Sequence, residues 1–412
     1  MASVRIENRA QLIYLLTESA ELEHGILCCY LFASMSLKDS VDEGISPEQL
    51  KAVRRWRELI REISLQEMLH LASVCNLLTA VGGAPQLRRP NLPVSPRAYP
   101  ESFKLRLFPF CMEAIDQFVA IEQPTSLLPP PPPEESMKLG KLSDIFSTER
   151  EYKSQGQLYG GVEDGLKYLA QKYGEDRLFV GPPGAQTADR YFNLPDLIPI
   201  RDLDSALKTL KVIVEQGEGA SADVPDSHYR KFLRIRDEYQ AILDEDEYFE
   251  PARPVLRNPH AIRPTDLATE SDINIIEDPL SIDVSSLFDG CYELMVQMLG
   301  RLFVHAEESE ADLRGLADTT AQMMTDVLLP LGNALTTLPA GPSHPGKNAG
   351  PSFRLSRGAS IPTHRDAAWT IFGERLNELA AYARFLRAEE GSPAAALAQV
   401  GEALSGFAAR FG

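Results

Sequence analysis

Hydrophobic residues recur along this chain mainly at alternating steps of three and four, which is the spacing of amphipathic helices. Strict alternation of apolar and polar residues, which indicates half-buried strands, is scarce. In the first part of the chain the pattern predicts helices over residues 10–37, 48–82, 107–122, 148–173, 201–219 and 225–243. Towards the C-terminus it predicts further helices over residues 283–307, 309–338, 365–389 and 392–409. The expected fold class is therefore all-α.

Two proline-rich segments divide this pattern. The stretch EDEYFEPARPVLRNPHAIRP, which starts at Glu245, has few helix signals and predicts a boundary between domains at 1–245 and 246–412. The stretch LPAGPSHPGKNAGPSFRLSRGASIPTH, which ends at His364, predicts a long Gly/Pro-rich loop in the second domain. The loop is basic for so acidic a chain. It is either a solvated connector or a lid whose Arg354 and Arg357 attract a substrate carboxylate.

Ionisable residues interrupt the apolar faces of the first two predicted helices. Glu23 falls inside the stripe of the first helix, and Glu67 and His70 occupy two rungs of the stripe of the second. Burying charged groups without partners costs several kcal/mol, so these residues need compensation in the core. A shared metal ion would provide it. The alternative is a buried Glu–His pair that is merely hydrogen-bonded.

Later helices supply further candidates. Glu163 lies one turn after Tyr159 on a largely apolar side of its helix. Glu218 continues the stripe of the helix 201–219, Glu215 lies about 60° away from it, and His228 begins the next helix. Tyr159 is a candidate catalytic residue that moves a proton or an electron, although an ordinary core tyrosine would show the same pattern. Glu122, at the end of the helix 107–122, is a weaker candidate ligand.

These residues follow the order Glu, Glu-x-x-His, Glu, and then Glu-x-x-Glu with a later His. Four-helix carboxylate proteins that bind two iron or manganese ions use one Glu from each of two helices and a Glu-x-x-His from each of the others. The second half departs from this scheme, because Glu218 stands where a histidine is expected. Oxygen and nitrogen ligands without thiolate favour iron, with manganese possible and zinc as a competitor. The predicted metal ligands are Glu23, Glu67, His70, Glu163, Glu215, Glu218 and His228.

Composition narrows the classes of partner. The net charge of −18 disfavours binding to nucleic acid or to an anionic membrane surface. No apolar run approaches the length of a membrane span. The five cysteines show no metal-binding spacing, and the N-terminal sequence does not match a signal peptide, so we expect a cytoplasmic protein.

Five stretches carry a resemblance to a known family: LTESAELEHGILCCYLFA, EISLQEMLHLASVCNLLTAVGG, FVAIEQP, GQLYGGVEDGL and IVEQGEGASADVPDSHYRKF. They resemble the ferritin-like family related to iminophenyl-pyruvate dimer synthases, which act in violacein and chromopyrrolate biosynthesis. The resemblance implies a ferritin-like four-helix bundle with an added C-terminal helical region.

The same resemblance implies an enzyme of specialised metabolism, a non-haem di-iron oxidoreductase that uses O₂ on an amino-acid-derived small molecule. Two alternatives stay open at this point. One is an enzyme that couples two imines, using its site mainly to orient them. The other is a non-catalytic iron-binding or storage protein. A homo-oligomer is possible in each case.

Overall fold

The computed structural model describes residues 6–95, 99, 103–128, 152–217, 224, 226–262, 272–305, 307–356, 361 and 364–412. The all-α prediction is confirmed, and the predicted helices lie where the hydrophobic pattern places them. The strands among the described residues are β1 (Pro259–His260) and β2 (Asn274–Ile275), which pair in parallel. Within this part of the chain no helix is both long and apolar enough to span a membrane.

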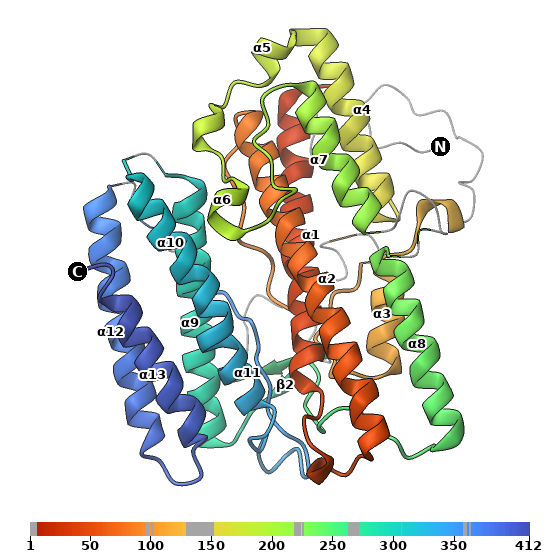
Figure 1. Ribbon diagram of the computed structural model, residues 1–412, viewed down its shortest axis with the longest axis vertical. Coiled ribbons are helices and arrows are strands. Elements are labelled where there is room, and N and C mark those ends of the chain that lie inside the picture. Colours follow the sequence, from red (N-terminus) through yellow and green to blue (C-terminus); the bar gives the residue numbers. More distant parts are fainter. Residues whose placement is uncertain are drawn as a thin grey trace.

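Two long helices, α1 (Arg9–Ser36) and α2 (Pro47–Ala80), pack side by side at the centre of the molecule (Figure 1). Ser46 and Gln49 form a capping box at the start of α2, where Pro47 occupies the first turn. α1 is buried on nearly all sides, because other helices cover it both within the bundle and from the C-terminal region. These two helices therefore act as the frame for the rest of the fold.

The other half of the bundle consists of short helices placed end to end. α4 (Gln155–Tyr173) and α7 (Leu203–Gln216) cover one end of the α1/α2 pair, and α3 (Met112–Ile121) and α8 (His228–Glu245) cover the other (Figure 1). Helix ends consequently meet near the middle of the bundle. The single-turn helices α5 (Glu175–Leu178) and α6 (Asp189–Phe192) lie in the connection between α4 and α7.

The C-terminal region forms a second group of helices beside α1 (Figure 1). It comprises α9 (Pro279–Phe303), α10 (Glu310–Gln322), α11 (Leu329–Leu335), α12 (Arg365–Arg387) and α13 (Ala394–Ala408). The helix predicted at 309–338 is interrupted, because a π-helical segment at Met323–Leu328 separates α10 from α11. Pro330 explains the interruption, since its ring clashes with the carbonyl group four residues earlier and it has no N–H to donate.

The described part of the loop after α11 is only partly a solvated connector, because Pro342, Ser343 and residues 345–347 are exposed while other residues enter the core. The lid role of Arg354 stays a prediction. Ala340, Ala349, Phe353 and Leu355 are buried there, and the Phe353 ring packs edge-on against Phe288 at 5.1 Å. Glycine and proline prevent a helix, but the apolar residues between them still enter the core. Arg357 lies outside the described residues.

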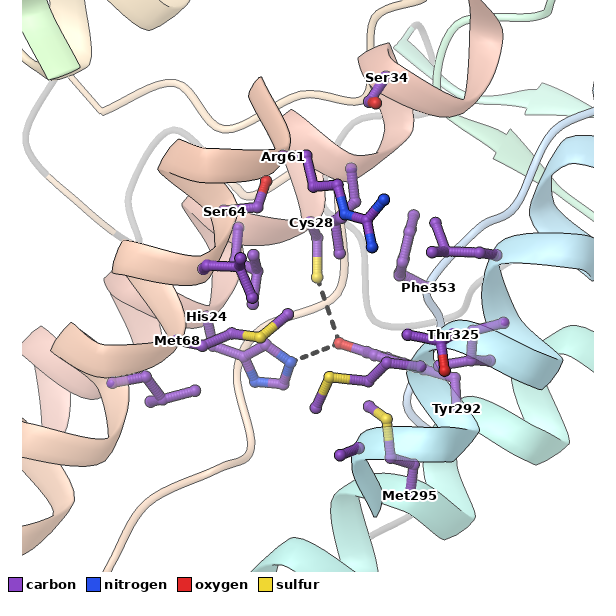
Figure 2. A pocket seen from close by; sticks show the side chains of 18 of the residues that line it. His24, Cys28, Ser34, Arg61, Ser64, Met68, Tyr292, Met295, Thr325 and Phe353 are labelled. Atoms are coloured by element: carbon purple, nitrogen blue, oxygen red, sulfur yellow. Dashed lines mark hydrogen bonds between the residues drawn. The ribbon is translucent and has the colours of Figure 1, made fainter. Parts of the chain in front are cut away.

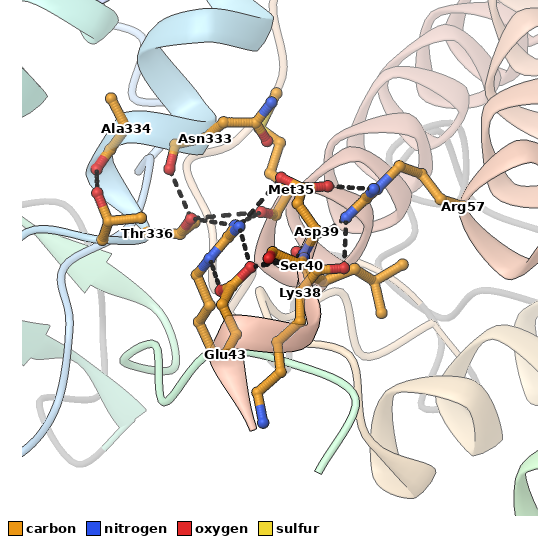
Figure 3. A network of polar contacts seen from close by, with 12 residues as sticks. Met35, Lys38, Asp39, Ser40, Glu43, Arg57, Asn333, Ala334 and Thr336 are labelled. Carbon is orange, nitrogen blue, oxygen red and sulfur yellow. Dashed lines mark hydrogen bonds and ion pairs between the residues drawn. The ribbon is translucent and has the colours of Figure 1, made fainter. Parts of the chain in front are cut away.

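A buried polar network joins the two groups of helices (Figure 3). Arg253, from the segment between α8 and β1, donates to Glu43 Oε2 at 2.6 Å and to Asp39 Oδ2 at 3.0 Å, near the end of α1. It also donates to Thr336 Oγ1, just after α11, at 3.1 Å. One guanidinium group thus connects the central bundle to the C-terminal region.

Candidate metal centre

Five buried residues converge near the middle of the bundle. Glu23 comes from α1, and Glu67 and His70 come from consecutive turns of α2. Glu122 is the residue at which α3 ends, and His228 is the first residue of α8. All five are almost completely inaccessible to solvent. We call them the carboxylate–histidine cluster.

The cluster consists of two triads that share one glutamate. In the first triad, Nδ1 of His70 lies 3.4 Å from Glu67 Oε2 and 3.7 Å from Glu23 Oε2. In the second, Nδ1 of His228 lies 2.9 Å from Glu67 Oε1 and 3.6 Å from Glu122 Oε1. Within each triad one ligand atom of every residue lies within 4.8 Å of the others. Glu67 therefore offers one oxygen to each side, as a carboxylate that bridges two ions would.

Several polar atoms of the cluster have no hydrogen-bond partner although they are buried. They are Glu23 Oε2, Glu122 Oε2, both Glu67 oxygens and Nδ1 of both histidines. Leaving such an atom unsatisfied costs about 1–3 kcal/mol, and more for a charged group. A metal ion in each triad would satisfy all of them, so the residues present fit two metal ions.

Polar neighbours fix the orientation of each outer ligand. Nε2 of His70 donates to Gln216 Oε1 at 3.0 Å, and Nε2 of His228 donates to Gln66 Oε1 at 3.1 Å. An amide oxygen only accepts, so each ring carries a proton on Nε2 and directs Nδ1, the atom that a metal ion would take, at the carboxylates. Such supporting contacts are typical of protein metal sites.

The two outer glutamates are held in a similar way. The Tyr159 hydroxyl donates to Oε1 of Glu23, and the Tyr30 hydroxyl donates to Oε1 of Glu122. Each carboxylate is thereby tethered by one oxygen, while its Oε2 has no hydrogen-bond partner. Each half of the cluster thus combines a tyrosine-tethered glutamate with a glutamine-tethered histidine, and Glu67 connects the halves.

Comparison with known proteins shows the family to which this helical bundle belongs. A sequence model described as ferritin-like matches residues 16–237, which is more than half of the chain. The chain belongs to the ferritin-like family. A crystal structure of a ferritin-like protein from Caulobacter vibrioides covers 79% of this chain and 96% of its own, with a TM-score of 0.50 and 19% identity. That likeness supports the fold.

Two curated relatives share more of the sequence. The 2-imino-3-(indol-3-yl)propanoate dimerase of Chromobacterium violaceum is 29% identical to 84% of this ferritin-like chain. The dichlorochromopyrrolate synthase of Lentzea aerocolonigenes is 26% identical to 92% of it. The alignments cover 34% and 39% of these two proteins, so the chain spans between one third and two fifths of their lengths. The expected resemblance is confirmed.

Electrostatics inside the ferritin-like bundle favour a cation. Burial and the Glu67 carboxylate raise the pKa of Glu23 to about 8. Burial opposes ionisation of Glu67, but His228 and His70 outweigh it and lower the pKa of Glu67. Burial also opposes protonation of His70, but the two glutamates raise its pKa to about 10. Protons thus occupy positions between the carboxylates that a divalent ion would take instead, so metal binding would release protons.

The structure brings together some of the predicted ligands and separates others. Glu23, Glu67, His70 and His228 meet in the cluster, whereas Glu163 and Glu215 do not. The Glu163 side chain is 43% exposed and pairs with Lys167 at 2.5 Å, and Glu215 is 47% exposed and faces Lys211 at 3.7 Å. Both lie on the outer sides of their helices, because α4 and α7 turn other residues inwards. Glu218 lies outside the described residues.

Two further residues complete the site: one was only a weak candidate from the sequence, and the other was not predicted. Glu122, the weaker candidate, is buried and belongs to the second triad. The signal for it was its place between the buried Ile121 and the helix-ending Pro124. Gln216, between the two predicted glutamates, is the residue that reaches His70. A neutral side chain on an amphipathic helix gives no sequence signal for such a role.

Proposed function

We propose that this ferritin-like protein is a metal-dependent enzyme that uses O₂ to oxidise an amino-acid-derived small molecule. The observation that carries the proposal is the pair of buried triads sharing Glu67, with polar atoms that have no hydrogen-bond partner in the described structure. Glu23, Glu67, His70, Glu122 and His228 would hold two iron ions, with manganese as the other candidate. Two bound iron ions would supply electrons for the reduction of O₂.

The protein's own residues would orient the centre and control protons within it. Burial and the nearby Glu23 raise the pKa of Tyr159 well above its usual value, so its hydroxyl stays protonated. That proton lies on the hydrogen bond to Glu23, the position from which it can be passed towards the centre. The surrounding apolar side chains, among them Leu158, Val162 and Phe118, exclude bulk water.

The substrate class comes from the two relatives. One is named for a 2-imino-3-arylpropanoate, an oxidised amino acid, and the other for a chromopyrrolate. We propose that residues 1–245 supply the metal centre and that residues 246–412 complete the enzyme as a separate helical domain. The five cysteines are free thiols, which agrees with the proposed cytoplasmic location. A homo-oligomer is compatible with this proposal.

A second candidate function is the coupling of two imines. The relative named as a dimerase favours it, because that protein joins two copies of an imino acid. In that case the protein would mainly bring two substrates together in a reactive orientation. The two functions differ in their products, since coupling yields a dimer and oxidation alone yields a modified monomer.

The test measures metal and turnover in the same preparation. Protein produced in iron-rich medium should retain up to about two iron ions per chain. It should also increase O₂ consumption when an amino-acid oxidase supplies an imino acid from L-tryptophan. Folded protein that retains neither iron nor manganese would overturn the proposal. Iron retention without turnover on any imino acid would favour storage, and a dimeric product would favour the coupling function.

A further inference from the structure

A cavity of about 430 Å³ lies between the central helix pair and the C-terminal region. Its walls come from α1 and α2 on one side and from α9, the π-helical segment and α11 on the other. His24 and Met68 face it, whereas their sequence neighbours Glu23 and Glu67 belong to the carboxylate–histidine cluster. The cavity and the cluster therefore occupy different faces of α1 and α2.

The cavity is mainly apolar and has the size of a small-molecule site. Met68 and Met295 line it, and Phe353 adds an aromatic wall (Figure 2). Met324 is a further lining methionine. Methionine side chains adapt their shape and make favourable contacts with aromatic rings. Phe353 comes from the loop after α11, which explains why that loop packs inwards. The lining thus suits a flat aromatic group.

Two polar side chains on the cavity wall already satisfy one another. The Tyr292 hydroxyl donates to Nε2 of His24 at 2.5 Å (Figure 2), and Nδ1 of His24 donates to the carbonyl oxygen of Leu87 at 2.8 Å. Arg89 Nη2 donates to the Tyr292 oxygen at 3.1 Å. Both ring nitrogens of His24 are therefore occupied. A ligand finds little free hydrogen-bonding capacity here, so the deeper part of the cavity requires an apolar group.

The rim of the cavity carries an available positive charge. Arg61 projects from α2 towards the cavity (Figure 2). Glu58, one turn earlier, also lines the cavity, but neither it nor any other described residue forms a hydrogen bond or ion pair with Arg61. The other arginine of the rim, Arg57, is bound to Asp39 and to the carbonyl oxygen of Leu37. Leu65, one turn after Arg61, is 51% exposed and extends the apolar lining outwards. A guanidinium group beside an apolar cavity is suited to a carboxylate.

We propose that this cavity is a ligand site distinct from the metal centre, and that it binds a small aromatic carboxylate. The aromatic group lies among Met68, Met295 and Phe353, and the carboxylate binds Arg61. This ligand class is consistent with the amino-acid-derived substrate of the proposed function, and to that extent it rests on that function. The site itself is argued from the cavity lining and from Arg61. It requires no metal ion. Binding here would place the ligand against faces of α1 and α2 that differ from the faces that carry the cluster.

Isothermal titration calorimetry of the full chain with indole-3-propionate and with indole tests this site. The carboxylate should bind wild-type protein more tightly than neutral indole does. Arg61→Gln should lower the affinity for indole-3-propionate by about tenfold, which corresponds to about 1.4 kcal/mol. The affinity for indole should stay unchanged. Lys51→Gln removes an exposed charge from the same helix outside the cavity, so it should change the affinity for neither ligand.

A second variant tests the same charge while leaving Arg61 in place, and it changes an exposed residue whose replacement should not disturb folding. Leu65→Asp places a carboxylate one turn from Arg61 at an exposed position. The new carboxylate should pair with Arg61, so the affinity for indole-3-propionate should fall here as well. Unchanged affinity in both variants, or no binding by wild-type protein at millimolar ligand, would overturn the proposal. The titration is repeated after metal removal with a chelator. If chelator treatment abolishes binding, the ligand belongs to the metal centre and the separate site is refuted. If the protein never holds metal but still binds the ligand, only the proposed oxidase function is refuted.

Discussion

Nδ1 of His228 lies 2.9 Å from Oε1 of Glu67, which joins the first residue of α8 to the middle of α2. The contact is possible because α8 begins where α7 has ended, at the level of the buried carboxylates. A helix start thus replaces the second Glu-x-x-His motif that the four-helix scheme uses. The carboxylate–histidine cluster depends on breaks between the short helices as much as on the long helices.

Replacing the shared glutamate should remove both metal ions. In Glu67→Gln one oxygen becomes an amide nitrogen that cannot ligate, and each triad loses charge, so metal content should fall from about two ions per chain to nearly none. Glu163→Gln is the matched control, since Glu163 is exposed and paired with Lys167. Elemental analysis measures both. Loss of metal in Glu163→Gln, with Glu67→Gln unaffected, would contradict the assignment from the structure.

Removing one histidine should affect one triad more than the other. His70→Ala takes away a ligand of the first triad, so metal content should drop towards about one ion per chain. Circular dichroism should still show a helical protein, because Ala is a good helix former. If His70 were only a hydrogen-bonded partner of the glutamates, metal content would stay constant and stability alone would fall.

Gln216 should act through His70 rather than on the metal directly. Gln216→Ala removes the acceptor for Nε2 of His70, so the ring loses its fixed orientation. Metal affinity should fall about 10- to 100-fold, as for other supporting contacts around metal ligands. Competition with a chelator of known affinity measures the change. Gln216→Glu keeps an acceptor oxygen at the same place and should restore much of the affinity.

Asp289 should make stability depend on pH. Burial raises its pKa from 3.8 to about 7, although Ser352 Oγ at 2.7 Å and the Arg354 amide at 3.2 Å donate to it. Between about pH 4 and pH 7 the unfolded chain releases this proton while the folded protein keeps it. Stability should therefore decrease with rising pH, by up to about 1.4 kcal/mol per pH unit from this group.

Asp289→Asn removes that contribution, so its thermal midpoint should rise relative to wild type as the pH increases from 5 to 8. Thermal unfolding followed by circular dichroism at several pH values measures the difference. Other groups titrate equally in both proteins, so the comparison isolates Asp289. A constant difference across this range would show that Asp289 is already ionised in the folded protein at pH 5.

Arg253 should contribute strongly to the attachment of the C-terminal region. Arg253→Met keeps much of the side-chain volume but removes the guanidinium hydrogen bonds to Glu43, Asp39 and Thr336, so we expect a loss of about 1–3 kcal/mol. Arg55→Met breaks an exposed pair with Glu238 and should change stability by less than about 0.5 kcal/mol. Chemical denaturation of both variants measures this. Equal effects would mean that the buried network adds no stability beyond that of a surface pair.

The sequence by itself determined the helices and the first half of the carboxylate–histidine cluster. Periodicity fixes which face of a helix is apolar, so Glu23, Glu67 and His70 were recognisable as polar residues on faces that must be buried. The capping residues and glycines around the helices also act locally, which is why the predicted ends agree with the structure to within a few residues for most helices.

Only the tertiary structure decided the second half of this cluster. Glu163, Glu215 and Glu122 all border apolar residues in the sequence, and which of them is buried depends on the neighbouring helices that cover each side. The helix breaks bring the end of α3 and the start of α8 to α2, while α4 and α7 direct their glutamates to solvent. Local periodicity describes a single helix, whereas a metal site requires the relative positions of several, and those follow from packing throughout the core.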